Sequence, residues 1–352
     1  MTIVIAPDSF KECLSASQVA EAIAYAAKER WPEATVVQLP LADGGEGTLE
    51  VLAGPMGLSI NTITVHDPLG RAVQARYGVA GETAVVEVAE ACGLHLLAKA
   101  ERNPMVASSQ GVGELLMDAY GKGSRRFIIG LGGTATCDGG SGMMGVTGIR
   151  EALRECSVEF LCDVTAPFVG PYGAARVFAP QKGASPEQVE LLEERLMEVA
   201  QTIMSETGVD IASIPGAGAA GGIAGALMAY SNAHLCSGIE RIMELCGFHR
   251  AITGASLIIT GEGKSDSQTL MGKVPYGVLK HSAGVPVALL SGRIEQSPAL
   301  LSAGFRHFVE ISPRSISLDD AINPATALKN IKTSVLNLRV NDMSHHTIVK
   351  NV

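Results

Sequence analysis

The sequence predicts an α/β protein with a parallel-sheet domain and a second, smaller α/β domain inserted in it. Several short apolar runs, each typical of a buried strand, alternate along the chain with segments of helical periodicity. The composition agrees, because 47% hydrophobic residues and 40 glycines suit a globular fold with many tight turns. At 352 residues the chain is long for a single hydrophobic core, so two domains are expected.

The first β-α-β unit is clearly delimited. Residues 3–6 form an apolar strand, and Ser15-Ala16-Ser17-Gln18 has the capping-box pattern that begins a helix. Pro32 ends that helix, since the residue before a proline disfavours helical dihedral angles. Residues 36–41 then form a second strand, which a right-handed crossover places parallel to the first.

The smaller domain has a different pattern, in which strand-like runs follow one another without helices. Residues 62–66, 73–79 and 83–88 predict antiparallel pairing, and residues 159–164 and 175–178 are interpreted as short strands of a second insertion. The predicted main domain comprises residues 1–61, 94–137 and 186–340, the smaller domain residues 62–93 and 138–185, and a polar tail residues 341–352.

Charge and cysteine content exclude several classes of function. The net charge of −9 argues against nucleic acid or an anionic membrane as a partner. No charged segment with an apolar core begins the chain, and the most apolar later stretch, residues 216–230, is too short to span a bilayer. The seven cysteines form no C-x-x-C pair, so neither a disulfide framework nor a zinc site is indicated. We therefore expect a cytoplasmic protein with a small-molecule substrate, as a monomer or a homodimer.

Four apolar runs end in a segment rich in glycine and carboxylates. These segments begin at Asp8, Asp43, Gly132 and Gly261. Because ligands bind beyond the carboxyl ends of parallel strands, we expect the four segments to converge on one ligand. Glycine lets backbone N–H groups approach a phosphate, and carboxylates suit a metal cation or proton removal from a hydroxyl. The pattern indicates a phosphoryl-transfer site. No P-loop is present, and G-x-G-x-x-G does not follow the first strand, so several loops are expected to share the phosphate.

The first two segments supply candidates for proton transfer and metal binding. Asp8 is placed to accept the proton of a substrate hydroxyl, and Lys11 to hold the transferred phosphate. The alternative is an Asp turn with a solvated lysine. Asp43, in Asp-Gly-Gly-Glu-Gly, suits Mg²⁺, and the alternative there is a tight turn before a helix with an acidic first turn.

The third segment is interpreted as a backbone anion nest. So many glycines in one loop cost conformational entropy on folding, which a mere turn does not explain. Gly132, Gly133 and Thr134 are the predicted phosphate- or nucleotide-binding residues, and Asp138 is a candidate metal ligand or base.

The fourth segment adds further candidates. Gly261 and Gly263 are predicted to bind phosphate or nucleotide, and Asp266 is a catalytic candidate that cannot be ranked against Asp8, Asp43 and Asp138. Cations for the substrate come from elsewhere in the chain. Lys273 follows this segment, Lys182 is a candidate clamp from the smaller domain, and Ser9 is a further substrate-binding candidate.

At these segments the chain resembles the bacterial glycerate kinases. The resemblance rests on an ordered series of motifs from residue 3 to about residue 292. They are Ile5-Ala6-Pro7-Asp8-Ser9-Phe10-Lys11, Ala42-Asp43-Gly44-Gly45-Glu46-Gly47, Asp67-Pro68-Leu69-Gly70, Gly130-Leu131-Gly132-Gly133-Thr134-Ala135-Thr136, Cys162-Asp163-Val164, Gln181-Lys182-Gly183-Ala184, Pro215-Gly216-Ala217-Gly218-Ala219-Ala220-Gly221-Gly222, and Thr260-Gly261-Glu262-Gly263 with Asp266, Gln268, Thr269, Gly272 and Lys273.

The resemblance implies a Rossmann- or flavodoxin-like domain with a second α/β domain inserted. It also implies an enzyme that phosphorylates D-glycerate with ATP and Mg²⁺, with 2-phosphoglycerate as the expected product. Two departures stand out: Cys137 occupies a position where the family usually has Asn, and residues 144–156 form a shorter segment than in typical members. The alternatives are a kinase of another small hydroxy acid, or, because of the short segment, a non-catalytic sensor of a sugar acid.

Overall fold

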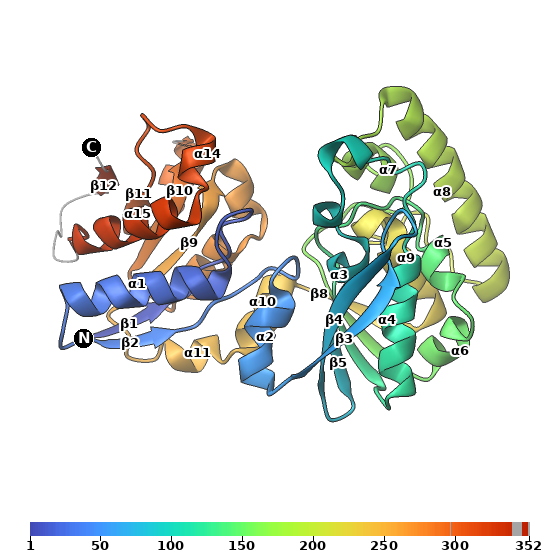
Figure 1. Cartoon of the computed structure of the whole chain (residues 1–352), viewed down its shortest axis with the longest axis horizontal. Helices are drawn as coiled ribbons and strands as arrows, with labels where there is room; N and C mark the ends of the chain where they lie inside the picture. Colours follow the sequence, from blue (N-terminus) through green and yellow to red (C-terminus); the bar gives the residue numbers. More distant parts are fainter. Residues whose placement is uncertain (296, 340–346, 351–352) are drawn as a thin grey trace. The chain divides into compact units, whose positions relative to one another are not determined.

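The computed structural model describes residues 1–295, 297–339 and 347–350, and the chain divides into two compact units (Figure 1). Unit 1 comprises Met1–Asp43, Glu50–Pro55 and Ile239–Val352, and unit 2 comprises Gly44–Leu49 and Met56–Gly238. Unit 2 is thus inserted in unit 1, which confirms the predicted two-domain α/β class.

Unit 1 is built on a six-stranded parallel sheet. Its strands, in spatial order, are β12 (Thr347–Lys350), β11 (His307–Glu310), β10 (Val287–Ile294), β9 (Leu257–Ser265), β1 (Thr2–Ile5) and β2 (Thr35–Gln38). Every neighbouring pair is parallel, so the carboxyl ends of all these strands lie at one edge of the sheet. The predicted strands 3–6 and 36–41 are confirmed as β1 and β2.

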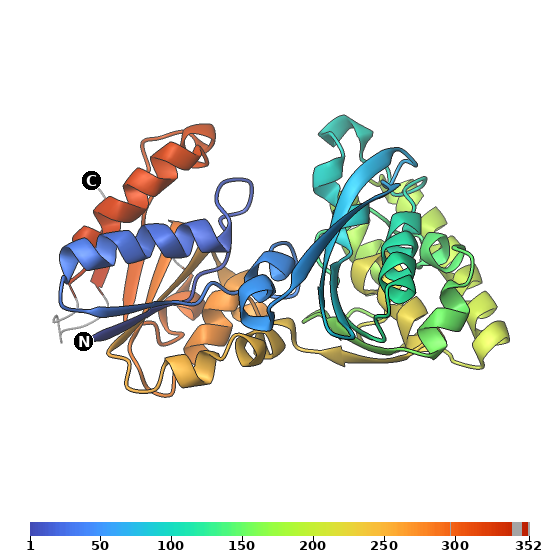
Figure 2. The ribbon, with the colours of Figure 1, turned by 60° about the horizontal axis from the view of Figure 1, so that its bottom comes forward.

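Helices cover this sheet, and its strands β1, β9, β10 and β11 are accordingly buried in nearly continuous runs. Helix α1 (Ala16–Arg30) begins at the predicted capping box, in which Ser15 and Gln18 bond each other's backbone N–H groups. It lies beside α15 (Pro324–Leu336), as Figures 1 and 2 show, and buried residues of both helices share one core cluster with Leu257 and Ile259 of β9. The other helical segments in or next to unit 1 are α2 (Thr48–Met56), α10 (Gly238–Leu245), α11 (Phe248–Ala251), η5 (Ser267–Met271), α12 (Val274–Lys280), α13 (Pro298–Leu301) and α14 (Leu318–Ala321).

Unit 2 has a mixed six-stranded sheet. Its strands follow one another in chain order: β3 (Ser59–His66), β4 (Ala72–Ala80), β5 (Thr83–Glu87), β6 (Arg126–Gly130), β7 (Ser157–Leu161) and β8 (Asn232–Cys236). The pairs from β3 to β5 are antiparallel, as predicted for this segment, and the pairs from β5 to β8 are parallel.

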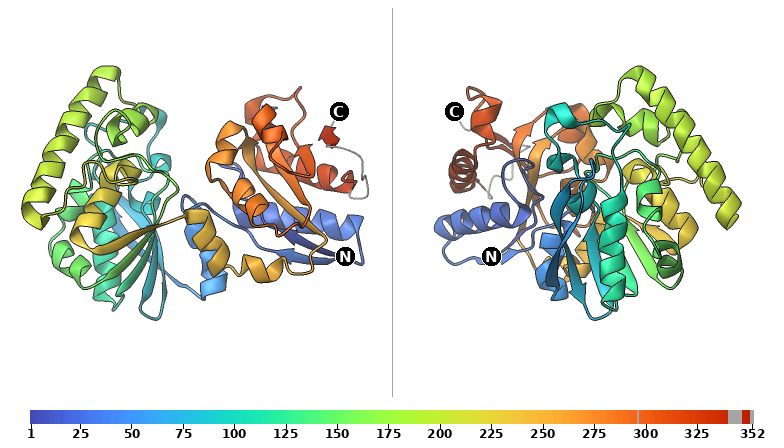
Figure 3. Two further views of the ribbon diagram at one scale, coloured as in Figure 1. Left: turned by 180° about the vertical axis from the view of Figure 1, so that it is seen from behind. Right: turned by 45° about the vertical axis from the view of Figure 1, so that its right-hand side comes forward.

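The core of unit 2 lies between this sheet and its helices. Helix α4 (Gln110–Gly121) lies across β3, β4 and β5, as Figure 3 shows. Tyr77 and Phe127 are buried in the same core cluster as residues of this helix. The other helical segments are α3 (Ala89–Cys92), η1 (Leu94–Leu96), η2 (Lys99–Glu101), α5 (Ser141–Met144), α6 (Ile149–Arg154), α7 (Ala174–Phe178), η3 (Pro180–Lys182), α8 (Pro186–Thr207), η4 (Ala219–Gly222) and α9 (Ile223–Tyr230). Among the described residues, no helix combines the length and apolar character needed to cross a membrane.

The division of the chain differs from the predicted boundaries. Residues 94–137 and 186–238 belong to unit 2, not to the domain that holds β1. Strand β6 pairs with β5 and β7, and α8 packs on that core, so these elements complete the inserted unit, which takes the larger part of the chain. A β-α alternation predicts parallel strands, but it does not say to which sheet each strand belongs.

Three local predictions are also corrected or limited. Residues 175–178 lie in helix α7, not in a strand. Within the predicted tail, residues 347–350 form β12 beside β11, while 340–346 and 351–352 lie outside the described residues. The short segment 144–156 includes α6 and joins the parallel strands β6 and β7, with Ile149 and Leu153 buried in the core.

Candidate functional site

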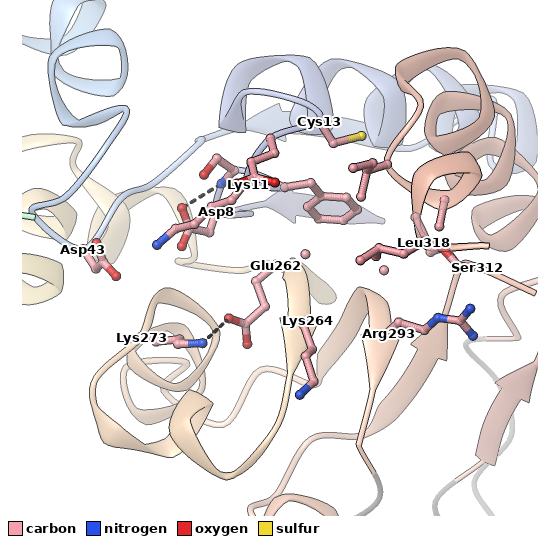
Figure 4. A pocket seen from close by; sticks show the side chains of 18 residues that line it. Asp8, Lys11, Cys13, Asp43, Glu262, Lys264, Lys273, Arg293, Ser312 and Leu318 are labelled. Atoms are coloured by element: carbon pink, nitrogen blue, oxygen red, sulfur yellow. Dashed lines mark hydrogen bonds and ion pairs between the residues drawn. The ribbon is translucent and has the colours of Figure 1, made fainter. Parts of the chain in front are cut away.

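Unit 1 contains a cavity of about 360 Å³ at the carboxyl ends of its parallel strands. Its lining comes from the segment after β1, from the last residues of β9 and β10, and from residues after β11 (Figure 4). Ligands of open parallel sheets bind in this location. The residues from the β1 side are Asp8, Ser9, Phe10, Lys11, Glu12 and Cys13, and those from the other segments are Asp43, Glu262, Gly263, Lys264, Lys273, Gly292, Arg293, Ile311, Ser312, Leu318, Ala321 and Ile322.

The fourth glycine-rich segment is a strand rather than a loop. Strand β9 continues to Ser265, and Lys264 lies opposite Arg293 of β10 in the register of the two parallel strands. Glycine is required here, because a Cβ on Gly261 would lie 1.7 Å from the carbonyl oxygen of Leu290. The carbonyl oxygen of Gly261 accepts the N–H of Asp8 at 2.9 Å. Gly261 therefore brings β10 and the Asp8 segment close to β9, and Gly263 lines the cavity.

Asp8 is the most perturbed acid of the cavity. Its side chain is buried, and the pKa of Asp8 is raised from 3.8 to about 8, mainly because burial disfavours the charged form. The negative charge of Asp43 contributes to this rise in the pKa, whereas the Ser9 N–H, 2.7 Å from Oδ1, and the ammonium of Lys11 oppose it. A carboxyl group that titrates near neutral pH inside a cavity is a candidate for proton transfer.

Glu262 is a functional candidate that sequence reasoning did not single out. Its buried carboxylate accepts hydrogen bonds from Ser265 (2.9 Å) and Thr269 (2.6 Å) on Oε1 and pairs with Lys273 (3.2 Å) on Oε2. It also raises the pKa of Asp8. The sequence signal for Glu262 is its position between Gly261 and Gly263, in a segment that the sequence predicts to bind phosphate.

Asp266 does not line the cavity. Its carboxylate accepts the N–H of Gln268 at 2.9 Å and so caps η5, and it pairs with Lys264 at 3.2 Å. Burial alone would raise the pKa of Asp266, but the Gln268 N–H and the Lys264 ammonium outweigh it and lower that pKa below 3.8. The arrangement indicates a structural role for Asp266 at the start of η5.

The remaining predicted residues lie together in unit 2. Lys182 is buried, and its Nζ donates to Thr134 Oγ1 at 3.1 Å and to the Thr136 carbonyl at 2.6 Å. Burial lowers the pKa of Lys182. The Gly132 N–H donates to the carbonyl of Gly44 at 3.3 Å, and Gly133 has a left-handed φ of +77°. Lys182 thus holds the glycine-rich loop in place.

Asp138 has both carboxylate oxygens engaged within unit 2. Oδ2 accepts the N–H and the hydroxyl of Ser109, both at 2.8 Å, and the N–H of Gly142 at 3.1 Å, while Oδ1 accepts the N–H of Gly140 at 3.0 Å. Four such bonds leave few lone pairs for a metal ion. Asp138 orders the loop between β6 and α5.

The structure thus brings the predicted residues together in two groups. Asp8, Ser9, Lys11, Asp43, Gly263 and Lys273 line the cavity of unit 1. Gly132, Gly133, Thr134, Asp138 and Lys182 belong to unit 2. Among the described residues, no group of three or more His, Cys, Asp or Glu side chains is arranged to hold a metal ion alone.

The fold and the cavity define an α/β protein with a polar small-molecule site at the ends of parallel strands. Comparison with known proteins gives the family. The model of the glycerate kinase family matches residues 3–152 and 144–339, so the chain belongs to that family.

Individual relatives agree with this assignment. The chain is 39% identical over 360 aligned positions to a glycerate kinase of Halalkalibacterium halodurans, covering 93% of this chain and 95% of the relative. It is 42% identical to the glycerate 2-kinase of Escherichia coli K12, covering 79% and 81%. A crystal structure from Salmonella typhimurium LT2, described as a candidate glycerate kinase 2, superposes with a TM-score of 0.80 at 38% identity, covering 96% of each chain.

The alignments with two relatives contain positions that have no residue in this chain. Since 93% of 352 residues is about 327, about 33 of the 360 positions aligned with the Halalkalibacterium relative have no residue here. For the Escherichia coli relative, 79% of 352 residues is about 278, so about 30 of the 308 aligned positions have no residue in this chain. The two family matches overlap at residues 144–152, within the predicted short segment.

Proposed function

We propose that this protein transfers the γ-phosphoryl group of ATP to a hydroxyl group of D-glycerate, with 2-phosphoglycerate as the expected product. The observation that carries the proposal is the buried Asp8, with a pKa near 8, beside Lys11 in a cavity at the strand ends. Membership of the glycerate kinase family supplies the substrate class. In the reaction, the hydroxyl oxygen bonds to the γ-phosphorus, the bond to the β-phosphate oxygen breaks, and ADP leaves.

Asp8 is proposed to accept the proton of the attacking hydroxyl. A general base works best when its pKa lies near the working pH, and burial gives Asp8 such a value. The Ser9 hydroxyl supports substrate binding next to it, because this buried group makes no hydrogen bond within the described residues. It can therefore bond to a hydroxyl or carboxylate of the acid.

Lys11 and Lys273 are proposed to bind the anionic groups. Phosphoryl transfer depends mainly on positioning and charge stabilisation, with little covalent chemistry from the protein. Glu262 holds Lys273 from one side, so the ammonium is oriented and its charge is partly offset before the ligand arrives. Glu262 is thus a positioning residue, and Lys11 is the cation proposed to contact the transferred phosphate.

The donor set at Asp8 and Asp43 fits Mg²⁺. Two carboxylates that repel each other are favourable for a divalent cation, and Mg²⁺ commonly uses one or two protein carboxylates together with substrate phosphates. Asp43 would hold the ion with the nucleotide phosphates. When bound, Mg²⁺ supplies neutralisation of phosphate charge, and a nearby cation favours the ionised form of Asp8.

An ADP-release assay with D-glycerate, ATP and Mg²⁺ tests the proposal. We expect turnover in the wild type, and a loss of roughly 10²- to 10⁴-fold in kcat for Asp8→Asn. Asp266→Asn is the matched control, because this carboxylate does not line the cavity and should keep most of the kcat. Equal activity of wild type and Asp8→Asn would remove Asp8 from the mechanism, and NMR of the product identifies the phosphorylated hydroxyl.

The same assay separates the alternatives. A panel of small hydroxy acids identifies a different substrate if one of them releases ADP faster than D-glycerate. Stabilisation by D-glycerate without any ADP release would indicate a sensor. Binding of phosphate or nucleotide by Gly132, Gly133 and Thr134, and of substrate by Lys182, stays a prediction. Retained activity in Lys182→Met, in protein that still folds, would contradict the role of Lys182.

A further inference from the structure

The cavity of unit 1 has an apolar end as well as a charged one. Asp43 and Lys273 lie at one side of Figure 4, and Leu318, Ser312 and Arg293 at the other. The apolar end consists of Phe10, Cys13, Ile311, Leu318, Ala321 and Ile322. The charged end has Asp8, Lys11, Asp43, Glu262 and Lys273.

Leu318 is the most unusual residue of the apolar end. Its side chain is 69% exposed although it lines a cavity, and it stands at the start of α14. Ile311, in contrast, is buried and forms a fixed wall. An exposed leucine beside buried apolar residues provides a surface that a ligand covers at a gain in free energy.

A three-carbon acid does not explain this end. Its carboxylate and hydroxyls would lose hydration against apolar side chains without compensating hydrogen bonds. Arg293 does not change this, because it already pairs with Glu310 at 3.6 Å and with the carbonyl of Ile316 at 3.4 Å. The volume of about 360 Å³ also lies within the range of roughly 300–1,000 Å³ typical of sites for larger ligands.

We propose that the apolar end binds the purine base of the nucleotide, with the phosphates directed towards Lys11 and Lys273 at the charged end. A nucleotide combines a flat base with apolar faces and a polyanionic tail, which matches the two ends of one continuous cavity. The base would lie against Leu318 and Ile311. This inference rests on the proposed kinase function.

Leu318→Gln tests the assignment without disturbing the core, because the side chain is largely exposed. We expect the KM for ATP to rise by about fivefold or more, from loss of apolar contact, and the KM for D-glycerate to stay unchanged. Ala321→Phe should weaken ATP binding further by filling the space. Leu328→Gln, on α15 and 40% exposed, is the matched control and should change neither constant.

Direct binding separates the base from the phosphates. Calorimetric titration with ADP should show weaker binding to Leu318→Gln, whereas inorganic tripolyphosphate should bind wild type and variant equally. An equal loss for both ligands, or a rise in the KM for D-glycerate instead of ATP, would overturn the inference. If the wild type binds ADP but has no kinase activity, the proposed function fails while these titrations still decide the place of the base.

Discussion

Replacement of the proposed base should make the protein more stable at alkaline pH. Asp8→Asn keeps the shape of the side chain and an oxygen for the Ser9 N–H, but it removes the titrating group. In the folded protein the pKa of Asp8 is raised from 3.8 to about 8. The unfolded carboxyl therefore loses its proton near pH 4, while the folded one keeps it until about pH 8.

The sign of the effect follows from proton binding. Between about pH 4 and pH 8 the unfolded state binds fewer protons than the folded state, so the stability of the wild type falls as the pH rises. A difference of roughly four pKa units corresponds to at most about 6 kcal/mol above pH 8, at about 1.4 kcal/mol for each unit. Asparagine stays neutral at every pH and avoids this cost.

Melting curves at a series of pH values, without Mg²⁺ or nucleotide, measure the effect. Near pH 4.5 the two proteins should have similar Tm values. At pH 8.5 the variant should melt at least several degrees higher, since 1 kcal/mol shifts Tm by roughly 2–4 °C in domains of this size. Asp266→Asn should have the opposite sign, because the pKa of Asp266 is lowered in the folded protein. The reasoning would be refuted if Asp8→Asn melted at a lower temperature than the wild type at pH 8.5, or if the difference between the two Tm values did not change with pH.

Three further predictions concern other residues. Glu262→Gln keeps its place between Ser265 and Thr269 but loses the charge opposite Lys273, so steady-state kinetics should show a higher KM for an anionic substrate; unchanged constants would exclude the positioning role. Gly261→Ala should abolish folding or lower Tm strongly, because its Cβ would lie 1.7 Å from the Leu290 oxygen, whereas Gly263→Ala, with its nearest atom at 3.6 Å, should fold; circular dichroism compares them. Asp138→Ala should destabilise the protein by at least about 3 kcal/mol, because four donors lose a charged acceptor, and wild-type melting would contradict its structural role.

The part of the site that could be predicted depends on a topological rule. Asp8 and Lys11 follow an apolar strand, and parallel strands direct their carboxyl ends to one edge, so their meeting with Asp43 in one cavity was predictable. The position of Glu262 was not. Its partners Thr269 and Lys273 reach it only because η5 returns the chain towards β9, and sequence spacing does not reveal that return.

Glycine-rich segments were the hardest to interpret from the sequence. Because glycine has a low strand propensity, the sequence does not predict that β9 continues through Gly261 and Gly263. The structure shows that glycine is needed at Gly261 because β10 approaches closely there. In unit 2, Asp138 among glycines resembled a metal ligand, but Ser109, 29 positions earlier, takes one of its oxygens. Local composition alone does not distinguish a loop that binds a ligand from one that binds itself.

The structure limits what the short segment 144–156 can change. The segment includes α6, which connects β6 to β7, and its apolar residues Ile149 and Leu153 are buried. Every residue that lines the cavity of unit 1 lies outside this segment. A shorter segment at this place therefore removes none of the cavity residues proposed for proton transfer, for phosphate or for the purine base. The segment belongs to unit 2, so the sensor alternative has no support from the lining of the cavity in unit 1, and the reaction proposed for Asp8 and Lys11 uses no residue of the segment.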